Sequence, residues 1–214
     1  MRKNPYSGKF IVFEGIEGAG GETQSKLLFD FWGEQGRRVK RLSYPDNKGP
    51  IGELIHKFLY REYDFSPEIQ FLLYLSDFLK DKQKIEEWKK EGEIIVSDRY
   101  FTSTLAYQCV QGISLSEALN IARIFELPKP DLIIYLKISP ETGIQRKIKE
   151  KTNLDRHESN KQFIEKVANF YEKLIKNQIY TNWVVIDGEK PIKAVFEDVK
   201  LQLKSLYEKH RDRS

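Results

Sequence analysis

Short apolar runs alternate along the chain with longer segments in which apolar residues recur every three or four positions. The length and apolar content of these runs predict five buried strands, at 10–14, 39–44, 93–97, 131–137 and 183–187. Helical spacing fills the segments between them, at 22–35, from 51 onward, from 67 to about 91, in two helices after 98, across 163–174 and after 191. This alternation predicts an α/β fold with a five-stranded parallel sheet and helices on both faces.

Polar and glycine-rich turns directly follow three of these strands. They are the glycine run that begins at Gly15, the turn at Pro45 and the turn at Asp98. Ligands of open parallel sheets bind beyond the carboxyl ends of the strands. We therefore expect the three turns to converge on one cleft.

Composition limits the class of protein without defining its function. The 214 residues fit a single domain over 1–214, and 40% of them are hydrophobic, which is typical of a globular chain. A single cysteine, Cys109, excludes a disulfide framework and favours a cytoplasmic location. The formal charge of +4 is too small to indicate nucleic-acid binding, and no apolar run reaches the roughly 18 residues of a membrane span. We expect His56 and His157 to lie at the surface, and no metal-ligand spacing involves them.

The glycine run resembles a phosphate-binding loop. Residues 13–24 read F-E-G-I-E-G-A-G-G-E-T-Q, and Gly15 and Gly20 have the spacing of the two fixed glycines in G-x-x-x-x-G-K-[ST]. A strand, such a turn and a helix form a cradle whose backbone N–H groups bind phosphate. The expected ATP-phosphate contacts are Gly15, Gly18, Ala19, Gly20, Gly21, Glu22 and Thr23.

The loop lacks two residues of that pattern. Gly21 stands where the lysine belongs, and Glu22 replaces the hydroxyl residue that usually holds Mg²⁺. Carboxylate oxygen is an accepted Mg²⁺ ligand, so Glu22, or Thr23 after a shift of one residue, could take over that contact. Taken alone, the segment fits a phosphate loop and a glycine turn without ligand about equally well.

The segment D-R-Y-F-T-S-T-L-A-Y-Q at 98–108 favours one family. It closely resembles the D-R-Y-x-x-S-x-x-A-Y-Q segment of thymidylate kinases. Further resemblances to that family follow in order along residues 10 to 200, in F-I-V-F-E-G-I-E-G-A-G, in Y-P with I-G-E-L-I, in P-D-L-I-I-Y-L with P-E and Arg146, in D-R-H-E, and in V-V-I-D-G.

The resemblance implies a P-loop nucleoside monophosphate kinase fold with a small lid at about 147–160. It implies the Mg²⁺-dependent reaction of ATP with dTMP to give ADP and dTDP. Family members are commonly homodimers that pack helices from the middle of the chain. The apolar stretch 67–80 fits such a contact, and it fits internal core equally well.

The resemblance also implies roles for individual residues. Asp98 would orient the Mg²⁺ shell, and Arg99 would bind the acceptor phosphate through its forked guanidinium group. Tyr74 would stack on thymine, with core packing as the alternative. The whole acceptor set that the resemblance implies is Glu17, Tyr74, Arg99, Ser103, Tyr107 and Gln108.

A basic lid is the expected source of the charge that the loop lacks. The sequence places Arg146, Lys147, Lys149, Lys151 and Arg156 there. We expect Arg156 to replace the loop lysine, with Arg146 as the second candidate and a structural role as its alternative. The lysines are equally compatible with a solvated helix face.

Two more positions depart from the family and leave other functions open. Many members have an arginine near Asn47 that holds the acceptor phosphate, and here Lys48 is the possible substitute. Phe78 stands where an arginine helps to read thymine. These departures motivate a kinase of broader base choice, and the altered loop motivates a catalytically impaired nucleotide-binding paralogue.

Overall fold

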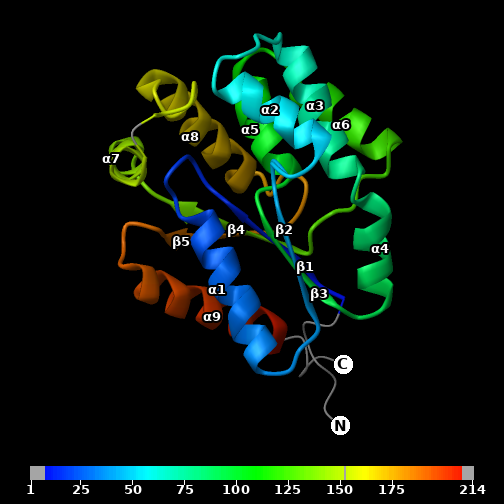
Figure 1. The fold of residues 1–214 in the computed structure, drawn as a ribbon. Helices are drawn as coiled ribbons and strands as arrows, with labels where there is room; N and C mark the ends of the chain where they lie inside the picture. The colour runs from blue at the N-terminus through cyan, green and yellow to red at the C-terminus, as the bar shows by residue number, and fades with distance from the viewer. Residues whose placement is uncertain (1–7, 152, 209–214) are drawn as a thin grey trace.

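The computed structural model of the chain describes residues 8–151 and 153–208, and in this part the five predicted strands form one parallel sheet in the order β2-β3-β1-β4-β5 (Figure 1). Observed bounds differ from the predicted ones by one residue at most. The strands are β1 (Phe10–Glu14), β2 (Val39–Ser43), β3 (Ile94–Asp98), β4 (Leu132–Lys137) and β5 (Trp183–Asp187).

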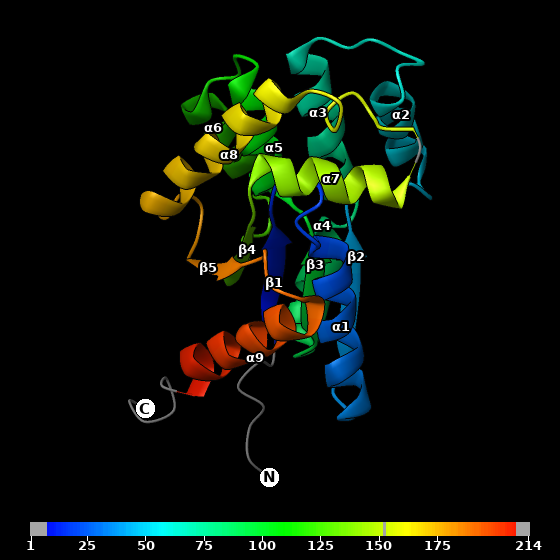
Figure 2. The same ribbon diagram turned by 90° about the vertical axis from the view of Figure 1, so that its left-hand side faces the viewer.

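Helices cover both faces of the sheet, as predicted (Figures 1 and 2). One face carries α1 (Gly21–Glu34) and α9 (Ile192–Glu208), which pack on each other. The helices on the other side include α3 (Pro67–Leu79), α4 (Lys82–Lys90), α5 (Phe101–Val110) and α8 (Lys161–Lys176). The remaining helices are α2 (Pro50–Leu59), α6 (Leu115–Ile124) and α7 (Pro140–Glu150). Within the described ranges, none of the helices has both the length and the apolar character to cross a membrane.

Burial explains the order of the strands. All five residues of β1 are buried, because β3 and β4 flank this strand on either side. The edge strand β2 reads V-K-R-L-S and is only partly buried, which fits its polar composition. In the parallel register Phe13 of β1 lies beside Asp98 of β3, so the turns that follow these two strands start at the same level.

One predicted element is wrong in extent. The stretch from Pro67 to about residue 91 is two helices, because the chain turns at Lys80 and Asp81. The Asp81 carboxylate accepts hydrogen bonds there from Tyr44, Lys80 and Lys84, and these contacts hold it at the junction rather than on a continuous helix.

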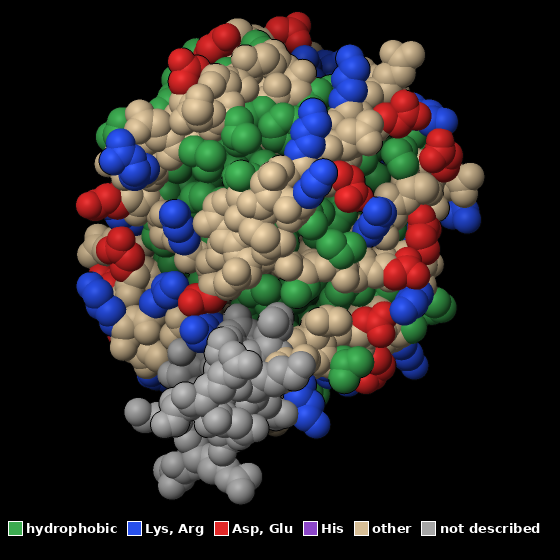
Figure 3. Space-filling view, turned by 180° about the vertical axis from the view of Figure 1, so that it is seen from behind, with side chains coloured by type: hydrophobic (Ala, Val, Ile, Leu, Met, Phe, Trp, Pro, Cys, Tyr) green, Lys and Arg blue, Asp and Glu red, His purple; other side chains and the backbone are tan. Residues whose placement is uncertain are grey.

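Helix α3 has one face in the core and one exposed face that carries apolar residues. Phe71, Leu75 and Phe78 are buried in the core, whereas Ile69 and Leu72 are exposed on the outer face. On the face of the molecule seen in Figure 3, hydrophobic side chains lie among lysine, arginine, aspartate and glutamate side chains. The structure therefore supplies an exposed apolar stripe on α3 as well as its core contacts.

Helix α7 lies directly against the glycine-rich loop (Figure 2). Ser139 caps its first turn by accepting a hydrogen bond from the Thr142 N–H, and Pro140 occupies the first helical turn. Three residues later, Gly143 packs on the backbone of Glu17 and Gly18. A Cβ atom at Gly143 would overlap the Glu17 carbonyl, and one at Gly18 would overlap the Gly143 carbonyl. The close approach of helix and loop therefore requires glycine on both sides.

We expect Gly143→Ala to destabilise the fold by about 1–3 kcal/mol, because the added methyl group overpacks this contact. Gly33→Ala is the matched control, since Gly33 is also helical and a Cβ there would meet nothing within 4 Å. The control should be stabilised by about 0.5–1 kcal/mol through helix propensity. Urea unfolding of both variants measures the difference, and equal effects would contradict the proposed packing.

Candidate active site

Two cavities open near the carboxyl ends of the strands. The larger, of about 610 Å³, is called the loop cavity and is lined by the predicted phosphate contacts Gly15, Gly18, Ala19, Gly20, Gly21, Glu22 and Thr23, together with Asp98 and Arg146. The smaller, of about 60 Å³, is called the aromatic cavity and is lined by the predicted contacts Tyr74, Ser103, Tyr107 and Gln108. Glu17 and Arg99 line both. The two cavities therefore meet at this pair of side chains.

The loop forms the expected anion cradle between β1 and α1. Gly20 has a φ of 93°, a backbone conformation that favours glycine, and it directly precedes the helix. No side chain caps the N-terminus of α1. The first N–H groups of the helix, which lack intrahelical partners, are therefore available to a ligand in the loop cavity.

Asp98 takes up the space beside Gly21. A Cβ atom at Gly21 would overlap the Asp98 carboxylate, so the lysine of an ordinary phosphate loop could enter only if Asp98 rotated away. Burial raises the pKa of Asp98 to about 6, with Arg99 opposing the shift and Glu14 and Glu22 adding to it. The missing lysine thus leaves an excess of negative charge on this side of the loop.

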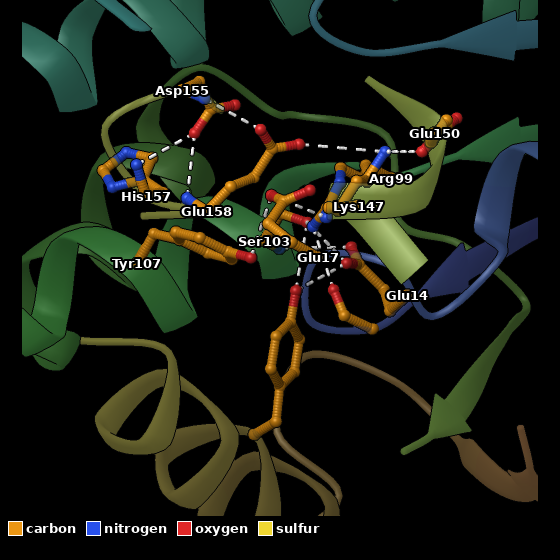
Figure 4. A network of polar contacts seen from close by, with 12 residues as sticks. Glu14, Glu17, Arg99, Ser103, Tyr107, Lys147, Glu150, Asp155, His157 and Glu158 are labelled. Carbon is orange, nitrogen blue, oxygen red and sulfur yellow. Dashed lines mark hydrogen bonds and ion pairs between the residues drawn. The ribbon is translucent and has the colours of Figure 1, made fainter. Parts of the chain in front are cut away.

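Arg99 is the central side chain of the site (Figure 4). Its backbone has a φ of 61°, a strained conformation for a non-glycine residue of the kind that clusters at functional sites. The guanidinium group binds Glu17 at 2.9 Å and donates to the Ser103 hydroxyl at 3.2 Å. Tyr107 donates to the same Glu17 oxygen at 3.1 Å. Two residues predicted from the D-R-Y segment, Arg99 and Tyr107, therefore bind the predicted acid of the loop, and Ser103 is joined to it through Arg99.

Glu14 is a candidate positioning residue that was not predicted from the sequence. Its buried carboxylate accepts hydrogen bonds from the N–H groups of Tyr100 and Ser103 and from the hydroxyls of Thr102, Ser103 and Tyr171. Burial raises the pKa of Glu14, although these hydroxyl contacts oppose the shift. The signal was an acidic residue at the end of a buried strand. By holding the start of α5 against β1, Glu14 positions Arg99 relative to the loop.

The two arginines expected to replace the loop lysine lie in different places. Arg146 lines the loop cavity and donates to the carbonyls of Gly18 and Gly188, at 3.2 and 2.9 Å. Arg156 lines neither cavity. Its guanidinium group lies over the Phe58 ring, 4.1 Å from the centroid, and binds Asp64 at 2.8 Å. In this structure Arg156 therefore fastens the segment after α7 to the end of α2 and does not face the loop.

Lys147 is the lid lysine that enters the loop cavity. Its side chain is only 20% exposed, so it does not belong to a solvated face. The ammonium group binds Glu150 at 2.7 Å and lies 3.8 Å from Glu158 (Figure 4). Burial would raise the pKa of Glu17, but Arg99 and then Lys147 outweigh it and hold that pKa below its usual value.

The aromatic cavity has one polar wall and one apolar wall. Tyr74 lines it, as the stacking role requires, and Phe78 lines it from the core, where it packs edge-on against Tyr44 at 4.9 Å between ring centroids. On the polar side, Gln108 Oε1 and Thr104 Oγ1 are buried without a hydrogen-bond partner among the residues that the structure describes. These two atoms are available to the base of a bound nucleotide.

His157 is buried, contrary to the surface position predicted for it. It is 7% exposed, lines the aromatic cavity and stacks on Phe163 with ring centroids 4.8 Å apart. Burial lowers the pKa of His157 to about 4, against the effect of Glu17 and with help from Arg156 and Arg99. The burial of His157 could not be predicted from the sequence, because it results from the docking of its segment on α2 and α5.

The two lysines closest to the positions of the missing family arginines do not line the aromatic cavity. Lys48 is exposed and lines neither cavity. Lys80, one of the bases closest in sequence to Phe78, is held by Asp46, Asp77 and Asp81 at 2.6 to 3.4 Å. Cationic recognition at the junction of the cavities therefore rests on Arg99.

A phosphate-binding loop on a five-stranded parallel sheet, with a second cavity joined to it by an arginine and an acid, defines a P-loop nucleoside monophosphate kinase. The family model for thymidylate kinase matches residues 13–199, and the chain belongs to the thymidylate kinase family. It is 33% identical over 210 residues to the thymidylate kinase of Thermosipho africanus, covering 94% of this chain and 98% of that protein. It is 29% identical over 196 residues to the human thymidylate kinase, covering 91% and 89%.

We expect His157→Phe to remove a pH-dependent loss of stability. An unperturbed imidazole has a pKa of about 6.5, so between that pH and about 4 the unfolded chain binds more protons than the folded one. Stability contributed by neutral His157 is present above pH 6.5 and is lost as the pH falls. The free energy of unfolding of the variant minus that of the native chain should therefore be about 1–2 kcal/mol more favourable at pH 5 than at pH 8.

Urea unfolding at the two pH values measures this change. His56→Phe is the matched control, because it makes the same substitution at an exposed histidine that lines neither cavity. An effect of His157→Phe that does not depend on pH would show that the imidazole titrates normally in the folded protein.

Proposed function

We propose that this chain is a thymidylate kinase that transfers the γ-phosphoryl group of ATP to dTMP and so supplies dTDP for dTTP synthesis. The observation that carries the proposal is the meeting of the two cavities at Glu17 and Arg99. ATP would occupy the loop cavity and dTMP the aromatic cavity. Phosphoryl transfer depends on alignment and on positive charge around a loose transition state, and Arg99 lies where the two phosphate groups would meet.

The acceptor side supports a pyrimidine deoxynucleotide. Tyr74 offers a face for base stacking, and Gln108 Oε1 offers an acceptor for a base N–H group. Glu17, held by Arg99 and Tyr107, would contact the sugar hydroxyl.

Mg²⁺ fits the residues on the donor side. Asp98 and Glu22 line the loop cavity with carboxylate oxygens and Thr23 adds a hydroxyl, and one or two carboxylates together with substrate phosphates are the usual Mg²⁺ environment. When bound, the ion would neutralise phosphate charge. At neutral pH most of Asp98 is ionised despite its raised pKa of about 6, so it would hold the ion in its charged form.

The assembly and the place of action are part of the same proposal. We propose a homodimer in which the exposed Ile69 and Leu72 of α3 are covered by a second copy. We propose a cytoplasmic location, because ATP and deoxynucleotide monophosphates are the substrates. The segment from 147 to 160 would act as the lid over both cavities.

The test is to mix the purified chain with ATP, Mg²⁺ and each of dTMP, dUMP, dCMP, dAMP and dGMP and to quantify the nucleoside diphosphates. We expect dTMP to be the best acceptor and the purine nucleotides to be poor ones. Comparable turnover of dCMP would favour the kinase of broader base choice, which the buried Phe78 in place of an arginine supports. No diphosphate from any acceptor would contradict the proposed function.

Gly21→Lys separates an active enzyme from an impaired paralogue. Because Asp98 occupies the space beside Gly21, we expect the variant to show no increase in kcat over the native chain. The same assay measures it, with ATP binding by calorimetry to confirm that the loop still holds nucleotide. A large gain of turnover in the variant, starting from an inactive native chain, would favour the catalytically impaired paralogue.

A further inference from the structure

Among the described residues, four cationic side chains line the loop cavity, and each of them has a partner in the protein. Arg99 is bound to Glu17, and Arg146 donates to two backbone carbonyls. Lys190 pairs with Asp198 and Lys147 with Glu150, both at 2.7 Å. Only these two lysines carry the compact ammonium group that a phosphate loop normally supplies. The Lys190 side chain is 45% exposed, whereas that of Lys147 is 20% exposed and extends from the helix that lies against the loop.

The backbone contact between α7 and the loop sets the direction of the Lys147 side chain. Gly143 lies against Glu17 and Gly18, and residues four positions apart share one face of a helix. Lys147 therefore extends over the loop from one turn beyond the contact. Its charge acts on Glu17, which lies where the two cavities meet.

Lys147 can leave its two glutamate partners and bind a phosphate group with little loss of folding stability. Glu150 is 59% exposed, so its pair with Lys147 contributes little to stability. Glu158 is 2% exposed, and Lys151 binds it at 2.8 Å, closer than Lys147 at 3.8 Å. If Lys147 turned toward a ligand, Glu158 would keep a cationic partner, and no buried charge would be left unpaired.

We propose that Lys147 is the catalytic residue that replaces the missing loop lysine and places its ammonium group on the β- and γ-phosphates of ATP. The inference rests on the proposed kinase function and names the source of charge within it. An ammonium group is a compact point charge with three donors on a flexible stem, which is the chemistry lost at Gly21. Supplied from α7, the charge would reach the phosphates only while that helix lies against the loop.

The test compares Lys147→Met with Lys149→Met. Both changes remove one lysine charge from α7, but Lys149 is exposed and lines neither cavity. We expect Lys147→Met to lower kcat about 100-fold or more, the size of effect typical for loss of one transition-state contact, and to weaken Mg-ATP binding about tenfold by calorimetry. Lys149→Met should stay within about threefold of the native chain on both measures.

Three further outcomes would test whether Lys147 replaces the loop lysine. Native turnover of dTMP with Lys147→Met unchanged in kcat and ATP affinity would overturn the inference and leave the proposed function standing. A native chain without turnover would contradict the proposed function, and the inference would then fail if both variants bound Mg-ATP equally well. Lys147→Arg keeps the charge and should retain most of the ATP affinity, so an equal loss in Lys147→Arg and Lys147→Met would assign the effect to packing and overturn the inference.

Discussion

The contact between two backbones, at Gly18 in the loop and at Gly143 in α7, is the constraint on which the rest of the site depends. Neither position has room for a side chain, so the helix lies as close to the loop as a polypeptide can. Arg146 reinforces the contact by donating to the Gly18 carbonyl. A cationic side chain on another element can reach the ligand of a loop without its own lysine only if that element is held this close to the loop.

Without a lysine in the loop, the charged side chains around the start of α1 are mainly acidic. Glu14, Glu22 and Asp98 lie around the start of α1, and the raised pKa values of Glu14 and Asp98 reflect burial that no loop cation offsets. The N-terminus of α1 supplies only a partial positive charge. The donor site therefore combines a backbone cradle with an acidic wall. We propose that it depends more on a metal ion and on α7 than an ordinary phosphate loop does.

Features that depend on local sequence could be predicted, whereas features that depend on long-range contacts could not. The strands, the loop and the D-R-Y segment could be predicted because apolar period, glycine spacing and residue order are written along the chain. The position of Arg156 could not be predicted, because it depends on the docking of residues 153–160 on α2, a long-range contact that no periodic pattern marks. Burial of His157 has the same origin. Lys147 and Lys149 look alike in sequence, and only the contact at Gly143 distinguishes the face that meets the loop.

The acceptor side resembles the donor side in lacking an expected cation. Phe78 stands where the family has an arginine, as Gly21 stands where a phosphate loop has a lysine. Phe78 extends the aromatic core through Tyr44 and Tyr100, and the neighbouring Lys80 is neutralised by three aspartates. We propose that discrimination among bases then comes from shape and from the oxygens of Thr104 and Gln108, which have no hydrogen-bond partner among the described residues. A site that rejects a wrong base by leaving such buried groups unpaired can discriminate well without a cation. Loss of charge at both cavities leaves Arg99 as the fixed cation at their junction, which explains why so many buried contacts, from Glu14 to Tyr107, converge on its surroundings.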